Sequence, residues 1–167
     1  MSASHPQTDF PGLLLDKAEQ LCQSGFCEAA LVTAQSACEI CCEQVLSFML
    51  KQRRIDYLQG ALHDLLTNYN VANPKTRKLY CAVTGAAIER QPFWQAYHEL
   101  VKHRNRVVHK GESVSSKEVE FYLKTAKGVI DYLKNVSMSA ESTHSSTEIC
   151  DLKDTVPPDT SFNASDD

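Results

Sequence analysis

Seven basic or amide side chains gather within nine positions of the chain: Lys102, His103, Arg104, Asn105, Arg106, His109 and Lys110. A histidine gives or takes a proton near neutral pH. An arginine holds two phosphate oxygens at once and stabilises the negative charge that develops in a transition state. An amide orients either group. This set suits a phosphodiester, and RNA carries its own nucleophile in the 2′-hydroxyl, so its cleavage needs no metal ion.

The spacing of these residues predicts where they lie on one helix. The apolar stripe of the helix runs through positions 94, 97, 101, 104 and 108, which puts Arg104 on the buried side, where a charge needs a partner or a function. Asn105 and His109 are four apart and share a face. Arg104 and His109 are five apart, which is about 7.5 Å along the axis, and they do not share a face. They can still flank a common cleft, because the arginine side chain is long and His109 lies where the helix ends. RNA cleavage by this route uses two proton-handling groups, and one chain offers a single well-placed histidine. A symmetric dimer that pairs two copies of the chain would complete the site.

The residues alone leave three interpretations open. The cluster is a ribonuclease site, or it holds RNA, a nucleotide or a protein partner without cleaving it. Alternatively it is structural, because cations at a helix C-terminus are favourable by the helix dipole alone. In the structural case Arg104 pairs with a carboxylate of an earlier helix, and Glu39 and Glu43 are the candidates.

The elements that position this cluster are predicted to be helices throughout. Apolar residues recur at three- and four-residue spacing in every segment between positions 10 and 134, and no segment alternates as a strand does. The predicted helices are 10–25, 26–52, a stripe from Ile55 to Tyr69, a stripe from Leu79 to Ala86, 92–110 capped by Gly111, and a last helix that begins with a Ser115–Glu118 capping box. The predicted fold is an all-α, up-and-down bundle of four to five core helices plus a short extra helix.

Length and charge divide the chain into three parts. At 167 residues it is about one domain long. We expect a flexible segment at 1–9, the helical bundle at 10–135 and a disordered tail rich in Ser, Thr and Asp at 136–167. The first 135 residues carry a net charge of +2 and the tail carries −6. No apolar run is long enough to span a membrane, and the N-terminus lacks a secretory signal. We therefore expect a cytoplasmic protein that does not bind membranes.

The seven cysteines invite a metal hypothesis, because Cys38, Cys41 and Cys42 lie close together. Structural zinc sites place paired cysteines on loops with glycine or turn residues, whereas these three lie in an apolar helical run. We interpret them as small buried thiols and expect neither a metal nor another cofactor.

Residues 104–111, Arg-Asn-Arg-Val-Val-His-Lys-Gly, resemble the R-N-x-x-x-H motif of HEPN domains (higher eukaryotes and prokaryotes nucleotide-binding). Trp94, Leu100 and Val101 precede the motif as in versions of that family, and residues 28–39 resemble its early helices. The likeness covers about residues 10–134. It implies a helical bundle that dimerises about the motif helices.

The resemblance also implies a function. Many members are metal-independent endoribonucleases that leave a 2′,3′-cyclic phosphate, and others only bind RNA or nucleotides. Several are toxins, often beside a nucleotidyltransferase antitoxin, or act in antiviral defence. By this resemblance Arg104 stabilises the phosphate, His109 is the general acid or base, and Asn105 is the polar helper. Glu39 matches an acidic position that orients the basic pair. A nucleotidyltransferase partner would be a separate chain.

Overall fold

The computed structural model describes residues 9–66 and 69–144, and every regular element within these ranges is helical. The all-α fold predicted from the apolar spacing is thus confirmed. The elements follow in the order α1 (Phe10–Gln23), α2 (Cys27–Gln52), η1 (Asp56–Leu58), α3 (Gln59–Leu65), α4 (Pro74–Thr84), η2 (Ile88–Arg90), α5 (Trp94–Lys110) and α6 (Ser116–His144). Residues 1–8, where we expected flexibility, lie outside the described residues.

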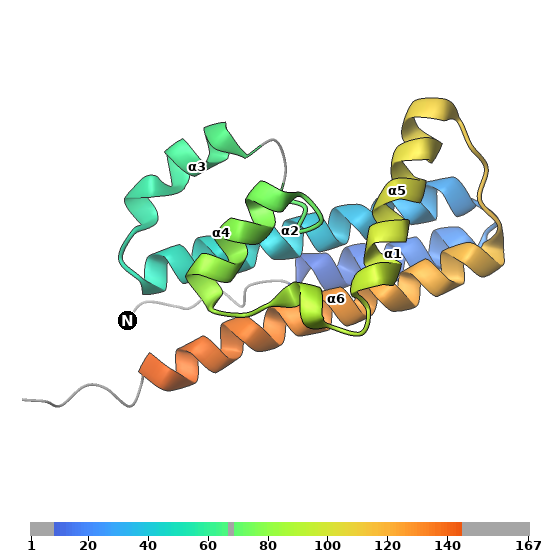
Figure 1. Ribbon diagram of the computed structural model, residues 1–167. Coiled ribbons are helices and arrows are strands. Elements are labelled where there is room, and N and C mark those ends of the chain that lie inside the picture. Colours follow the sequence, from blue (N-terminus) through green and yellow to red (C-terminus); the bar gives the residue numbers. More distant parts are fainter. Residues whose placement is uncertain (1–8, 67–68, 145–167) are drawn as a thin grey trace, which may run out of the picture.

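α2 is the central helix and contacts α1, α4, α5 and α6. α1 and α6 run alongside it, while α4 and α5 lie across these long helices (Figure 1). The buried face of α2 consists largely of small side chains, among them Ala30, Ala34 and Ala37, whose exposed fraction is 0%. Because these side chains are short, the neighbouring backbones approach closely and the core is densely packed.

The cysteines of α2 belong to this core. The thiols of Cys38 and Cys41 point at α6 and donate weak hydrogen bonds to the carbonyl oxygens of Ala126 and Ile130. Burial raises the pKa of Cys41 to about 12 and that of Cys38 well above its usual value. These groups are therefore protonated at neutral pH and pack as small apolar side chains.

The third and fourth helices are shorter than the apolar spacing predicted. The stripe that begins at Ile55 is divided between η1 and α3, and Tyr69 lies beyond the end of α3. A helix of seven residues depends on packing for its stability, and the exposed Tyr57 shows how little of this segment is covered. α4 ends before Ala86, because Gly85 takes a left-handed conformation (φ 72°) that terminates the helix.

α6 is longer than predicted and continues nine residues past position 135, to His144. Val136 packs partly against the core, one turn after the buried Leu133. The Ser137 hydroxyl donates to the carbonyl oxygen of Lys134 within the helix. The apolar spacing and these local hydrogen bonds extend the helix into the segment that we expected to be a tail. The rest of that tail, 145–167, lies outside the described residues.

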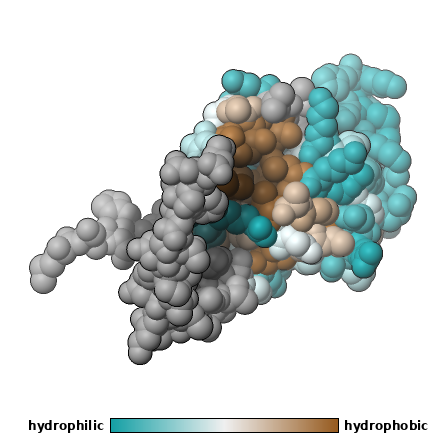
Figure 2. Space-filling model, turned by 60° about the vertical axis from the view of Figure 1, so that its left-hand side comes forward, coloured by the Kyte–Doolittle hydropathy of each residue, from teal (hydrophilic) through white to brown (hydrophobic). Residues whose placement is uncertain are grey.

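The hydropathy of the surface differs between the two ends of the bundle. Figure 2 brings forward the end that carries α3 and shows an apolar area bordered by hydrophilic side chains. The last turns of α5 lie at the opposite end of the molecule (Figure 1). None of the described helices has the length and apolar character of a membrane span.

An acidic residue fixes the start of α1. The Asp9 carboxylate accepts a hydrogen bond from the Gly12 N–H (3.0 Å) and forms an ion pair with Lys134 of α6 (2.6 Å). Pro11 lies in the first turn, where its missing N–H costs nothing. The cap therefore ties the beginning of α1 to the last third of α6.

We expect Asp9→Asn to destabilise the protein at neutral pH and less so in acid. The hydrogen bond from Lys134, and then that from the Gly12 N–H, lowers the pKa of Asp9. Because the folded pKa lies below the unfolded value of about 3.9, the stabilisation is fully present above that value and is lost as the pH falls through the folded pKa. Urea unfolding should show a difference of at most about 1 kcal/mol at neutral pH, since the pair is exposed. A difference that stays constant in acid would contradict this account.

Candidate functional site

The candidate site lies on the last two turns of α5, which project beyond the long helices (Figure 1). The first part of α5 is anchored in the core by Tyr97 and Leu100, with exposed fractions of 1% and 0%. Gly111 ends the helix in a left-handed conformation (φ 64°), as its position predicted. The helix thus presents its C-terminal side chains at one end of the molecule.

Arg104 is half-buried and lies beside Asn105. Its Nη1 donates a hydrogen bond to the Asn105 Oδ1 (3.1 Å), which orients the guanidinium. Its Nε is buried and has no hydrogen-bond partner among the described residues. Nor does Arg104 form a salt bridge within those ranges, so neither Glu39 nor Glu43 neutralises it. The result is a positioned cation whose charge is not compensated by a carboxylate.

His109 and Lys110 are exposed at the end of α5. His109 lies one turn after Asn105, on the same side of the helix. Within the described residues no hydrogen bond, ion pair or ring contact involves the His109 ring. The structure therefore brings Arg104 and Asn105 into contact, while His109 stands about 7.5 Å farther along the axis from Arg104.

Two of the three other candidate cations are already paired. The Arg106 Nε donates to both carboxylate oxygens of Glu112 (3.0 and 2.9 Å). Lys102 forms an ion pair with Glu99 (2.8 Å), and this hydrogen bond is the main cause of the lowered pKa of Glu99. Of the predicted substrate-binding residues, Lys110 is the one without such a carboxylate among the described residues.

Among the described residues, Glu39 has a hydrogen-bond partner on its own helix and none in the basic pair. Its carboxylate accepts a hydrogen bond from Gln35 Nε2 (3.3 Å), and that amide also contacts the buried Tyr97 hydroxyl (3.3 Å). Tyr97 precedes His109 by twelve positions, which corresponds to about 18 Å along α5. Glu39 therefore belongs to a polar network near the start of α5, and its role in orienting the basic pair stays a prediction.

His103 is the residue of this region that the sequence interpretation did not place. It is 3% exposed, its Nδ1 lies 3.3 Å from the Tyr122 hydroxyl, and its Nε2 lies 3.7 Å from Glu112. His103 continues the buried series of Tyr97 and Leu100 at a spacing of three, which is the signal that could have located it. His103, on α5, thus contacts α6 through Tyr122 and the segment after the motif through Glu112.

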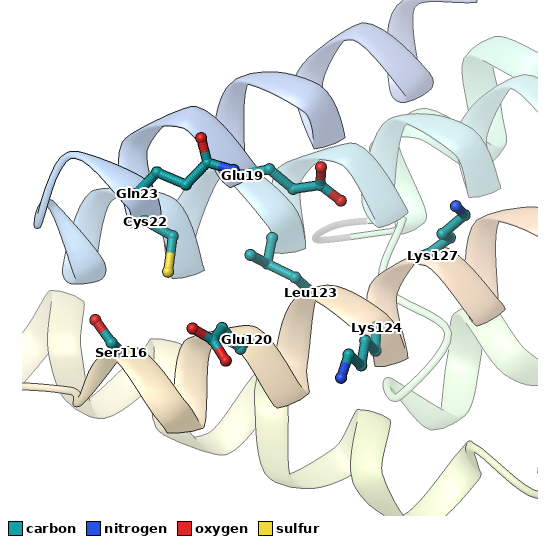
Figure 3. Close-up of a pocket in the computed structure, with 8 residues that line it drawn as sticks. All are labelled: Glu19, Cys22, Gln23, Ser116, Glu120, Leu123, Lys124 and Lys127. Carbon is teal, nitrogen blue, oxygen red and sulfur yellow. The ribbon is translucent and has the colours of Figure 1, made fainter.

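A separate pocket of about 600 Å³ lies between α1 and α6 (Figure 3). Carboxylates of Glu19 and Glu120 line it together with Cys22 and Lys127. Burial raises the pKa of the Cys22 thiol. None of the candidate residues of α5 lines this pocket, and its two carboxylates are balanced by Lys124 and Lys127.

Comparisons with protein-family models, with curated proteins and with solved structures find no match for this chain. Its function must therefore be argued from the residues and geometry of the site.

Proposed function

We propose that this protein is a cytoplasmic, metal-independent endoribonuclease of the HEPN type. The observation that carries the proposal is the state of Arg104, which is oriented by Asn105 and has no carboxylate partner among the described residues. A half-buried guanidinium whose charge is uncompensated is suited to an anionic ligand. His109, exposed one turn farther on, supplies an imidazole, the side chain most often used as a general acid or base.

The proposed reaction is an attack of the RNA 2′-hydroxyl on the adjacent phosphorus. The bond from O2′ to phosphorus forms and the bond from phosphorus to O5′ breaks, which leaves a 2′,3′-cyclic phosphate and a 5′-hydroxyl. Arg104 stabilises the charge on the non-bridging oxygens, and Asn105 holds its guanidinium. His109 takes the proton from the 2′-hydroxyl or delivers one to O5′. Lys110 attracts the phosphate chain.

Two proton transfers require a second acid or base, and we propose that a second copy of the chain supplies it. The projecting end of α5 offers Val108, which is 48% exposed, next to His109. Pairing of two α5 helices through this end would bring two copies of His109 to one cleft. A toxin or defence role, with a separate nucleotidyltransferase-type antitoxin, is the setting that the motif suggests.

The second candidate function is an RNA- or nucleotide-binding module without catalysis. One observation favours it: within the described residues no group fixes the orientation of the His109 ring. A general base is normally held by a hydrogen bond to its second ring nitrogen. In this alternative Arg104 and Lys110 hold the phosphate chain and nothing is cleaved.

Incubation of the full chain with end-labelled, mixed-sequence RNA in EDTA tests the two functions. We expect cleavage, products that end in a cyclic phosphate, and a mass in solution that corresponds to a dimer. RNA that is bound but stays intact would replace the ribonuclease by the binding module. RNA that is neither cleaved nor bound would leave Arg104 and His109 with a structural role.

A further inference from the structure

A cation and two aromatic rings form a cluster where α4 meets the start of α5. The Cζ of Arg77 lies 5.3 Å from the centroid of the Trp94 ring. The ring of His98, one turn after Trp94, meets the same indole edge-on with centroids 4.5 Å apart. All three side chains are partly exposed. The cleavage chemistry proposed above uses none of them.

The charge of α4 is concentrated at this cluster. The helix contains Lys75, Arg77 and Lys78 and no acidic residue. Within the described ranges none of these three cations forms a salt bridge. They lie near the N-terminus of α4, where the helix dipole already contributes positive potential and disfavours cations. Arg77 also donates a hydrogen bond to the carbonyl oxygen of Ala72 (3.4 Å). The helix dipole does not account for Lys75 and Lys78, whose charges are suited to attract a polyanion.

The aromatic part of the cluster is suited to an unpaired base. Bases of single strands stack on indole and imidazole rings and on guanidinium planes. Burial, and then the charges of Arg77 and Lys102, lowers the pKa of His98 below its usual value. Its ring is therefore neutral at neutral pH and stacks without repelling Arg77.

The cluster and the cleavage site lie on the same helix. Trp94 precedes Arg104 by ten positions, which corresponds to about 15 Å along α5. Val101 lies between Trp94 and Arg104 along the helix, and Asn105 lies next to Arg104. Both are on the same side of the helix as Trp94, and both are at least partly exposed. A nucleic-acid strand with one phosphate at Arg104 can thus follow α5 to Trp94, and a dinucleotide is too short to reach both.

We propose that Arg77, Trp94 and His98 form a subsite that binds an unpaired base of single-stranded RNA, while Lys75 and Lys78 hold the adjoining phosphates. The subsite rests on the proposed function, because it extends the RNA path from Arg104. It assigns the substrate class, since bases inside a duplex are not available for stacking.

Trp94 is the single tryptophan of the chain, so its fluorescence reports on the subsite directly. We expect an unstructured oligouridylate to quench this fluorescence, and a uridine dinucleotide or a duplex RNA to leave it nearly unchanged. Arg77→Gln should weaken oligouridylate binding about tenfold. Arg77→Lys keeps the positive charge but loses the planar guanidinium, so it should weaken binding by an intermediate factor. Arg54→Gln removes the same charge at the end of α2 and serves as the matched control.

Cleavage kinetics separate a failure of the subsite from a failure of the proposed function. If both hold, Arg77→Gln raises KM for the oligonucleotide and leaves dinucleotide cleavage unchanged. If wild type cleaves, but Trp94 fluorescence is unaffected and Arg77→Gln behaves like Arg54→Gln, the subsite is overturned and the ribonuclease stands. If nothing is cleaved, yet quenching occurs and Arg77→Gln weakens it about tenfold, the subsite stands and the proposed cleavage is overturned. Equal quenching by duplex RNA overturns the assignment to single strands.

Discussion

Replacing His109 with alanine is expected to reduce RNA cleavage by about 10²- to 10⁴-fold, the range found when a positioned general acid or base is removed. RNA binding should change little, because the proposed role of His109 is to transfer a proton rather than to supply a fixed positive charge. Arg104→Gln should lower both cleavage and binding, since it removes the charge that meets the phosphate. Single-turnover cleavage and fluorescence anisotropy of labelled RNA measure the two effects.

A second histidine provides the control for this prediction. His63 is exposed on α3, far along the chain from the motif, and His63→Ala should cleave like wild type. Thermal unfolding of each variant separates loss of chemistry from loss of fold. Because Arg104 has no carboxylate partner among the described residues, its removal should cost little stability. Unfolding or dissociation of Arg104→Gln would instead support the structural interpretation.

Leu100→Ala is expected to destabilise the protein by about 2–5 kcal/mol, the cost of opening a cavity at a buried leucine. Leu100 has an exposed fraction of 0% and fixes the middle of α5 against the core. Its loss should therefore also loosen the helix that carries Arg104 and His109. Urea unfolding followed by far-ultraviolet circular dichroism measures the free energy of unfolding.

The matched variant is Leu13→Ala on α1, where the same side chain is 50% exposed. It should change the free energy of unfolding by about 0.5 kcal/mol or less. If the two leucine variants had equal effects, α5 would not be packed through Leu100, and the position of the cleavage site relative to the bundle would have to be revised.

The sequence by itself determined the helical architecture, the ends of α2 and α5 and the start of α6. Apolar residues at three- and four-residue spacing predicted helices between positions 10 and 134, and the regular elements of the described residues are helical. Gly111 and the Ser115–Glu118 box act through bonds between neighbours in the chain, so their roles were readable locally. The end of α4 had a local signal as well, in Gly85. The end of α6 did not, because the packing of Val136 against the core continues that helix.

Whether Arg104 or Arg106 is paired was decided only by the tertiary structure, whereas the Lys102–Glu99 pair is an i,i+3 contact within one helix. The sequence places Lys102, Arg104 and Arg106 on one helix with equal formal charge. The fold turns the chain back after Gly111 so that Glu112 pairs with Arg106 and faces His103, while Arg104 contacts Asn105. It also places Glu39 beside Gln35 and Tyr97, away from His109. Helical periodicity reports which residues share a face, but pairing across elements depends on how separate helices and turns meet in space. That meeting is set by the packing of the whole core, and no local pattern encodes it.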